Sequence, residues 1–372
     1  MEKLKFCWLI GLMVALPIRA ETGVTDQEII LGQSAALTGP AAELGKQFRD
    51  GAASYFKIVN AAGGINGRQI KLVSLDDGYE PERAVLNTKK LISETKVFGQ
   101  FGYVGTPTSN AALPLVTEAR VPFFGAFTGA ESLRTPMNHY VFNVRASYKN
   151  ETQAIVDFIP APSAQRLAVI YQNDAYGQAG LTGITEALAK VNLKPAVSAS
   201  VERNSVDVAK AVETVAKAKP AVLVIISAYA SSAAITRAIQ RINPDIKIWN
   251  VSFVGSQALS AELGESGRGV GISQVVPFPW DGANNIALEH RDAHGLANVS
   301  FTSLEGYIAA KALVEGLKKA GKNLTREGFI KALETSGPMN LGGFVLKYTP
   351  TDHTGSKFVD LSMIGKAGKF VH

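Results

Sequence analysis

The sequence contains almost no cysteine and no second long apolar run. Its one cysteine, Cys7, lies near the start of the 372 residues, so the rest of the chain has no thiol for disulfides, thiolate metal sites or nucleophilic catalysis. After residue 20, no run reaches the ~18 apolar residues that a membrane-spanning helix needs. The formal net charge of +6 includes no basic block, which gives no support to nucleic-acid binding.

Catalytic and metal-binding patterns are also missing. The segment Gly32–Ala36 resembles a nucleophile elbow but lacks its closing glycine, and no Gly-x-Gly-x-x-Gly motif stands where a dinucleotide would need it. His290 and His294 could share one helix face, but Glu289 does not complete the zinc-protease pattern, and a solvated helix surface is the better interpretation. We therefore expect a protein that is not an enzyme and that has no cofactor and no metal.

Residues 1–20 have the pattern of a secretory signal peptide. Lys3 and Lys5 precede the apolar run Phe6–Leu16, and Ala20 offers a small residue for cleavage. The surroundings of Cys7 do not fit a lipid-attachment site. We therefore expect an exported, untethered protein, located in the periplasm.

The remaining chain predicts an α/β protein of two domains. Roughly 350 residues exceed the ~250 to 300 at which a single core stops growing. Strands and helices alternate, starting with a strand near Ile30, a helix from about Gly45 and a strand over 69–75. Strands such as Val222–Ile226 are apolar throughout, which is typical of parallel strands covered on both faces. We expect two parallel sheets, with the tail from 342 to 370 forming two strands joined at 350–356.

Two loops that follow neighbouring strands predict an anion-binding site. Thr106 suits a helix N-cap and Pro107 the first helical position, so unpaired N–H groups and the positive helix end would lie there. An ordinary capped helix would have the same pattern. A second loop of this kind, made of Phe127, Thr128 and Gly129, follows the next strand. Two such loops at adjacent strand ends favour a site for a carboxylate.

Four further residues at strand ends are candidates for ligand contacts. Tyr176 and Tyr229 follow strands of the second half, where an aromatic ring can close over a ligand, although tyrosine is as often a half-buried packing residue. Ser252 follows a third strand, and a capping or turn role is equally compatible with its position. Tyr79 follows the strand over 69–75 and completes the group.

Several segments together resemble the periplasmic solute-binding proteins of the leucine/isoleucine/valine-binding type, which serve ABC importers. The resemblance covers nearly all of the chain after the signal. The segments that carry it are Ala36–Pro40, Asn60–Gly67, Asp76–Asp77 and Thr106–Thr128.

The resemblance implies a type I periplasmic binding fold, in which two Rossmann-like lobes are joined by three crossovers and close on a ligand. Lobe 1 would comprise residues 21–144 and 277–338, and lobe 2 would comprise 145–276 and 339–372. The crossovers would lie near 143–146, 274–278 and 337–343.

The resemblance also implies roles for single residues. Thr106 and the Phe127–Gly129 loop would hold the ligand carboxylate, Tyr176 would be the aromatic residue that the second lobe brings over the ligand, and Tyr229 would lie near another contact. The implied partners are a small carboxylate or amino acid and an ABC permease in the inner membrane, with the protein a monomer.

Two positions depart from the family pattern. Amino-acid binders place a glutamate against the ligand ammonium where this chain has Ser252, and Leu44 replaces a tyrosine of the first lobe. A serine cannot balance a buried cation, and Glu305 is the candidate to compensate. The ligand is therefore an amino acid of the branched-chain type by family default, or else an aromatic or aliphatic acid without an ammonium group. A ligand-sensing subunit of a membrane receptor remains the other functional class.

Overall fold

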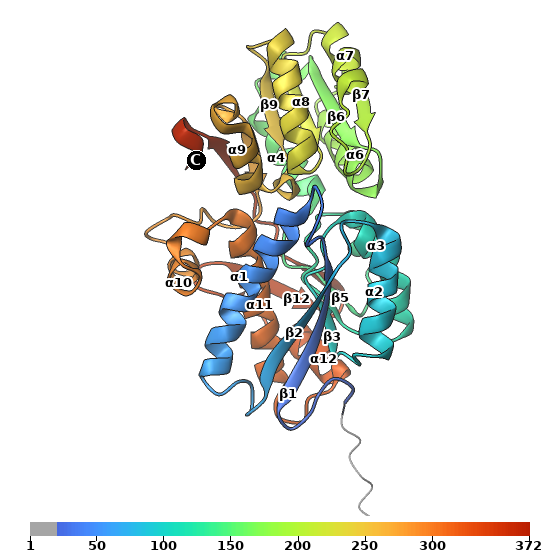
Figure 1. Cartoon of the computed structure of the whole chain (residues 1–372), viewed down its shortest axis with the longest axis vertical. Helices are drawn as coiled ribbons and strands as arrows, with labels where there is room; N and C mark the ends of the chain where they lie inside the picture. Colours follow the sequence, from blue (N-terminus) through green and yellow to red (C-terminus); the bar gives the residue numbers. More distant parts are fainter. Residues whose placement is uncertain (1–20) are drawn as a thin grey trace, which may run out of the picture.

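The computed structural model describes residues 21–372 and shows two α/β halves stacked along the long axis (Figure 1). We call them the lower half and the upper half, as they stand in Figure 1. This arrangement confirms the predicted α/β class. Among the described residues, no helix combines the length and the apolar character needed to cross a bilayer.

The lower half is built on a five-stranded parallel sheet of order β2-β1-β3-β4-β5. Its strands are β1 (Glu28–Ala35), β2 (Gln69–Asp76), β3 (Gly99–Phe101), β4 (Phe123–Phe124) and β5 (Val141–Phe142). Its helices are α1 (Ala42–Ala61), α2 (Pro81–Ser93), α3 (Thr106–Glu118), α10 (Asn285–His294), α11 (Phe301–Ala320) and α12 (Arg326–Thr335).

Helices α1 and α11 form the closest helix pair of the lower half (Figure 1). The predicted apolar stripe of α1 is buried, including Phe48 and Phe56. Two glycines allow the backbones to touch: a Cβ on Gly51 would lie 2.0 Å from the carbonyl oxygen of Ser303, and one on Gly306 would lie 2.0 Å from that of Phe48. An early helix and a late helix of the chain therefore share one core.

The upper half is built on a seven-stranded sheet of order β15-β14-β10-β9-β8-β6-β7. Its strands are β6 (Leu167–Gln172), β7 (Val197–Val201), β8 (Val222–Ile226), β9 (Lys247–Asn250), β10 (Gly271–Gln274), β14 (Asp360–Ile364) and β15 (Phe370–Val371). Its helices are α4 (Tyr148–Phe158), α5 (Ala161–Ala164), α6 (Ala175–Ala189), α7 (Ala209–Lys217), α8 (Tyr229–Ile242) and α9 (Ser256–Leu263). All of β8 is buried, as its apolar sequence predicts. The sheet is mixed rather than wholly parallel, because β14 and β15 add an antiparallel edge.

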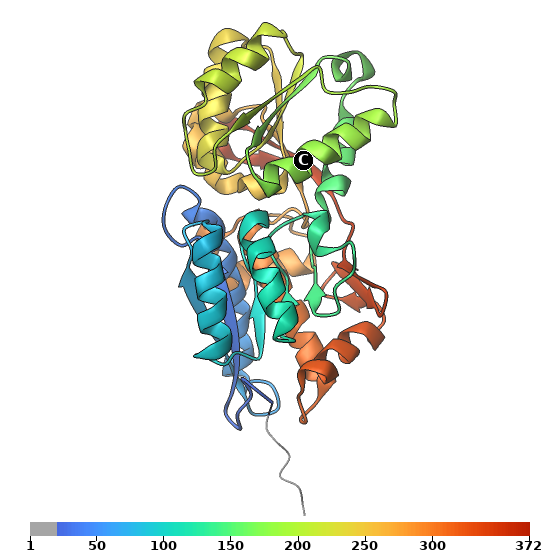
Figure 2. The same cartoon turned by 90° about the vertical axis from the view of Figure 1, so that its right-hand side faces the viewer.

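The C-terminal tail differs from the expected pair of strands. Strands β11 (Met339–Asn340), β12 (Val345–Thr349) and β13 (Asp352–Gly355) form a small antiparallel sheet in the lower half (Figure 2). Tyr348 holds this sheet in place, because its buried ring packs edge-on against Phe142 and its hydroxyl donates to the carbonyl oxygen of Asn143 at 2.7 Å. The third crossover therefore lies at 356–359, between β13 and β14, and not at 337–343.

The other two passages between the halves precede α4 and α10. The chain leaves the lower sheet after β5 and leaves the upper sheet after β10. Five strands of each sheet follow the same order, with the first strand of each half between the second and the third. In this order ligands bind beyond the carboxyl ends of the first and third strands, which points to the ends of β1 and β3 below and of β6 and β8 above.

Candidate ligand-binding site between the two halves

The two threonines expected to hold a carboxylate lie side by side. The hydroxyl oxygens of Thr106 and Thr128 are 2.7 Å apart, and both side chains are buried. Their proximity follows from the pairing of β3 with β4, which brings the two following loops to one edge of the sheet.

The start of α3 differs by one residue from the prediction. The N-cap is Gly105, at a φ of 99°, and Thr106 is the first helical residue. Glycine is required at this position because a Cβ would lie 2.1 Å from Cε2 of Tyr79. The backbone N–H groups of the first helical turn have no acceptor within the helix, so Thr106 brings an N–H, a hydroxyl and the positive helix end to one point.

Five aromatic rings form a connected group beside the threonine pair. From the lower half, Phe127 and Tyr79 have centroids 5.3 Å and 5.8 Å from that of Phe253. Phe253 belongs to a short 3-10 turn of the upper half and also lies 4.6 Å from Tyr176. Tyr148, at the start of α4, has its centroid 5.3 Å from Tyr176 and its hydroxyl 3.3 Å from that of Thr128. The rings of both halves therefore form one apolar wall.

Tyr79 and Tyr176 have different polar surroundings. Gln172 at the end of β6 donates to the Tyr79 hydroxyl at 3.2 Å, whereas the buried Tyr176 hydroxyl has no partner among the described residues. Burial raises the pKa of both phenols well above its usual value, so both stay protonated. The Tyr176 hydroxyl is thus an unused donor beside Phe253.

Tyr229 lies at the rim rather than beside the threonines. It is the first residue of α8, and its hydroxyl accepts from the backbone N–H of Glu43 on α1 at 3.5 Å. Leu44 reaches the same region, because its Cδ2 would lie 2.4 Å from a Cβ placed on Gly255 of the upper half. The structure therefore places Tyr229 and Leu44 in a contact between the halves.

Gly129 packs too closely on Tyr148 for any side chain. A Cβ there would lie 2.7 Å from the Tyr148 backbone nitrogen, and the Gly129 carbonyl accepts from that nitrogen at 2.7 Å. This contact fixes the Thr128 loop to the start of α4.

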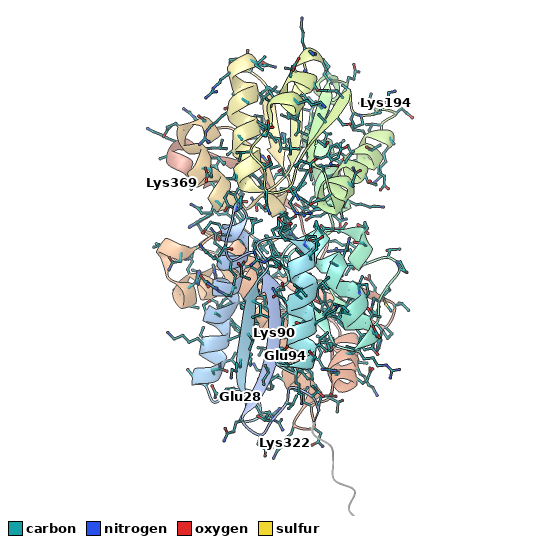
Figure 3. All side chains as sticks on the ribbon, turned by 45° about the vertical axis from the view of Figure 1, so that its right-hand side comes forward. Glu28, Lys90, Glu94, Lys194, Lys322 and Lys369 are labelled. Carbon is teal, nitrogen blue, oxygen red and sulfur yellow. The ribbon has the colours of Figure 1, made fainter. Side chains whose placement is uncertain are left out.

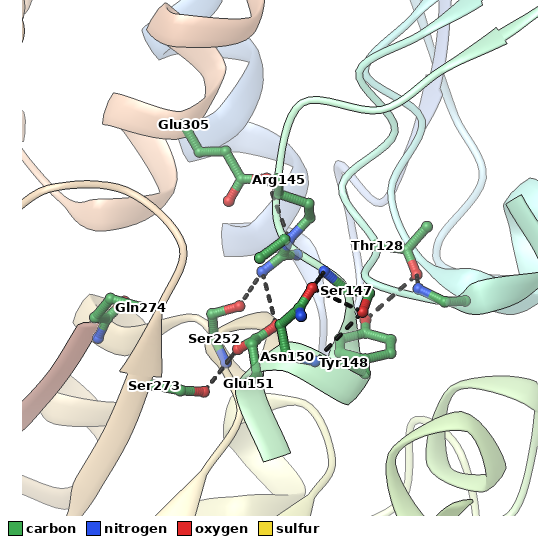
Figure 4. A network of polar contacts seen from close by, with 12 residues as sticks. Thr128, Arg145, Ser147, Tyr148, Asn150, Glu151, Ser252, Ser273, Gln274 and Glu305 are labelled. Atoms are coloured by element: carbon green, nitrogen blue, oxygen red, sulfur yellow. Dashed lines mark hydrogen bonds and ion pairs between the residues drawn. The ribbon is translucent and has the colours of Figure 1, made fainter. Parts of the chain in front are cut away.

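Sequence reasoning missed Arg145, which is fully buried at the passage from β5 to α4 (Figure 4). Its Nη2 donates to the hydroxyl of Ser252 and lies 3.6 Å from a carboxylate oxygen of Glu151, and its Nε lies 3.5 Å from one of Glu305. Its Cζ is 4.9 Å from the Phe127 ring centroid. One guanidinium thus contacts residues of both halves.

The charges in this group depend on one another. Burial raises the pKa of Glu305 to about 7, although the Arg145 guanidinium lowers it. Burial lowers the pKa of Arg145, but the Glu305 and Glu151 carboxylates raise it above its usual value, so Arg145 is charged. Glu305 therefore pairs with Arg145, a cation of the protein itself. It does not replace the glutamate that the family places against a ligand ammonium where this chain has Ser252.

Arg134 connects the threonine loop to the Arg145 backbone. Its guanidinium donates to the carbonyl oxygens of Ala130 at 2.7 Å and Arg145 at 3.0 Å. These bonds fix the position of Arg145 relative to Thr128.

One weak sequence signal could have revealed Arg145. It is the single charged residue in the segment Val141–Ser147, which is otherwise uncharged and which crosses between the halves. Tyr148 and Phe253 had no comparable signal, because aromatic residues next to buried strands are common in any core.

The histidine pair does not lie on a solvated surface as predicted. His290 is fully buried and its ring lies 5.1 Å from that of His294 and 5.4 Å from that of Tyr307. Burial, with His294 beside it, lowers the pKa of His290 to about 3. Within residues 21–372, no cluster of three or more His, Cys, Asp or Glu side chains could hold a metal ion.

Comparisons with known proteins agree with the fold and with a binding site. The family model for periplasmic binding proteins matches residues 28–369. The chain superposes with a TM-score of 0.88 on a possible leucine/isoleucine/valine-binding protein from Rhodopirellula baltica, at 33% identity and covering 96% of this chain and 98% of that one.

Two curated relatives show a more distant similarity. An amino acid binding protein from Pseudomonas aeruginosa is 29% identical over 202 residues, which cover 52% of this chain, so the match spans about half (53%) of that relative's length. The Leu/Ile/Val-binding protein homolog 3 from Brucella melitensis is 22% identical over 90% of both chains. These matches confirm the predicted resemblance and the expectation of a binding protein.

Proposed function

We propose, because the chain belongs to the periplasmic binding protein family, that it is the substrate-binding component of an ABC importer and captures a small carboxylate between its two halves. One observation carries the proposal. The paired hydroxyls of Thr106 and Thr128 lie 2.7 Å apart at the start of α3, beside aromatic rings from the opposite half.

This arrangement suits a carboxylate with an apolar substituent. The two hydroxyls and the N–H groups at the helix start can donate to the carboxylate, and hydrogen bonds to a charged group contribute roughly 1.5 to 3 kcal/mol each. Phe127, Tyr176 and Phe253 then offer apolar surface to the rest of the ligand. The names of the relatives favour an amino acid of the branched-chain type.

Capture requires a ligand that prefers the closed arrangement. The threonines belong to the lower half, whereas Tyr176 and Phe253 belong to the upper half. A ligand that contacts both sets gains its full binding free energy only when the halves meet, which shifts the population toward the closed state. We propose that the halves move as two lobes about the three crossovers.

The remaining parts of the proposal concern location and partners. Residues 1–20, which lie outside the described residues, would act as a signal peptide that sends the chain to the periplasm. The closed monomer would then dock on an ABC permease of the inner membrane.

The proposal is tested by ligand titration of the mature protein. Thermal-shift screening of amino acids and simple carboxylates identifies binders, and calorimetry measures their affinity. Thr128→Val is expected to lower the affinity by about 10- to 100-fold, the value of one hydrogen bond to a charged group. Thr185→Val, a surface substitution on α6, is the matched control and leaves the affinity unchanged. A protein that binds no carboxylate, or whose affinity is insensitive to Thr128→Val, would contradict the proposal.

A further inference from the structure

Arg145 places a permanent positive charge beside the proposed carboxylate site. Its side chain has no exposed surface. Its guanidinium carbon lies 4.9 Å from the ring centroid of Phe127 and 6.0 Å from that of Tyr148. Phe127 directly precedes Thr128, and the Tyr148 hydroxyl lies 3.3 Å from that of Thr128. The charge is therefore separated from the threonine pair by about one aromatic ring.

The two buried carboxylates near this charge both lie within ion-pair distance of Arg145, although Oε1 of Glu151 accepts no hydrogen bond within residues 21–372. Glu151 accepts from the backbone N–H of Ser252 at 2.8 Å and from the hydroxyl of Ser273 at 2.6 Å, and it lies 3.6 Å from Arg145 (Figure 4). Glu305 lies 3.5 Å from the Nε of Arg145. A second cation in this region would compete with Arg145 for the same oxygens and would be repelled by it, in surroundings where an unpaired charge is costly.

The guanidinium has buried donors that make no hydrogen bond within residues 21–372. These are Nη1 of Arg145 and its Nε, which lies 3.5 Å from the Glu305 carboxylate. Buried donors of a charged group gain strongly from an acceptor oxygen. The local chemistry thus favours an anion and disfavours an ammonium group.

We propose that Arg145 makes the site select carboxylates that lack an α-ammonium group, so that the ligand is a plain aliphatic or aromatic carboxylic acid and not a zwitterionic amino acid. This inference rests on the proposed function, because it concerns the ligand of the same site. Arg145 acts as a specificity determinant, since it balances Glu151 and Glu305 and leaves no counter-charge for the ligand.

The test compares ligands that differ only in the ammonium group. Isocaproate is leucine without its ammonium group, and hydrocinnamate is phenylalanine without it. Calorimetry with the mature protein is expected to show the deaminated member of each pair binding at least about 100-fold more tightly, the ratio expected when a buried charge lacks a partner.

Variants of Arg145 connect this preference to its charge. Arg145→Lys keeps a cation and is expected to keep the preference. Arg145→Gln leaves Glu151 and Glu305 without their cation, so the ratio of affinities shifts toward the amino acid by at least about tenfold. Arg326→Gln removes a largely buried guanidinium of the lower half that bonds to the carbonyl oxygens of Phe98 and Val97. This control is expected to lower the melting temperature without changing the ratio.

The outcomes separate the two proposals. If leucine or phenylalanine binds as well as its deaminated partner to the unaltered protein, the inference about Arg145 is overturned while carboxylate capture stands. If no member of either pair and no other carboxylate binds, the proposed function fails and the inference fails with it. The comparison in the unaltered protein decides the matter even where Arg145→Gln does not fold.

Discussion

The side-chain amide of Gln172 in the upper half donates a hydrogen bond of 3.2 Å to the phenol oxygen of Tyr79 in the lower half. Gln172 ends β6 and its amide also lies 2.6 Å from a carboxylate oxygen of Asp174. Tyr79 sits against Gly105 at the start of α3. This bond therefore joins the carboxyl-terminal edges of the two sheets directly.

Tyr79→Phe is expected to weaken ligand binding more than it weakens the fold. It removes a hydrogen bond that joins the halves, worth about 1 kcal/mol, so the affinity falls by about fivefold. Tyr103→Phe is the matched control, because Tyr103 is equally buried but bonds to Thr88 and Gln100 within the lower half. Calorimetry and thermal melts of both variants measure the difference. Equal affinity losses in the two variants would contradict the assignment of Tyr79 to closure.

Stability is expected to fall with rising pH because of Glu305. Its pKa is raised from 4.5 to about 7 in the folded protein, so the folded state binds this proton more tightly than the unfolded chain does. The free energy of unfolding therefore decreases as the pH rises from about 4.5 to 7, by at most about 3 kcal/mol. Denaturant titrations across this range should show a flatter profile for Glu305→Gln. Glu315 lies on the surface of the same helix and pairs with Lys318, so the control Glu315→Gln should keep the pH dependence of the parent protein.

Asp76 is expected to stabilise the loop that leads into α1. Its carboxylate accepts from the backbone N–H of Leu37 at 2.8 Å and from the hydroxyl of Thr38 at 2.6 Å. Burial raises the pKa of Asp76, but these hydrogen bonds and one from the Gly78 N–H hold it well below its usual value. Asp76→Asn should therefore cost about 2 kcal/mol of unfolding free energy at neutral pH.

The pH dependence of that loss has a definite sign. A lowered pKa stabilises the folded state above the usual value of 3.8 and loses this effect as the pH falls through the folded pKa. The difference between the Asp76→Asn variant and the parent protein should shrink in acid. Asp26→Asn, at an exposed position, should match the parent at every pH.

The ion pair between Arg203 and Glu80 is expected to make a small, salt-sensitive contribution to closure. Arg203 of the upper half lies 2.8 Å from Glu80 of the lower half, and both side chains are partly exposed. Exposed pairs contribute about 0 to 1 kcal/mol, so Arg203→Met should lower the affinity by at most about fivefold, and less at high salt. Lys217→Met breaks an exposed pair with Glu213 on α7 and should leave the affinity unchanged. An effect of Arg203→Met that grows with salt would contradict this explanation.

The meeting of Thr106 and Thr128 was predictable because it depends on local pattern. Each follows an apolar strand, and consecutive strands of an α/β sheet usually pair, so their loops reach one edge. The apolar stripe of α1 and the buried run of β8 were predictable for the same reason. In these cases periodicity alone determines which face is buried.

Other features were not predictable because they depend on distant partners. Arg145 bonds to Ser252, which is 107 positions away, and no periodic pattern distinguishes a charged residue in an extended segment. The departure at Ser252 was visible in the sequence, but the cation beside it was not. Likewise, the late third crossover results from Tyr348 packing on Phe142, a contact that alternation in the tail does not reveal.

The contact between α1 and α11 has a consequence for how the chain matures. Helix α1 ends at residue 61 and its partner begins at residue 301, with most of the upper half, from α4 to β10, between them. During synthesis, the face of α1 that packs on α11 at Gly51 therefore waits for most of the chain to emerge before its partner is made. The strands and helices from α4 to β10 form a continuous stretch and need no such delay. A chain truncated before Phe301 would therefore leave this face of α1 open to aggregation or to a chaperone, and it would also lack the antiparallel edge of the upper sheet.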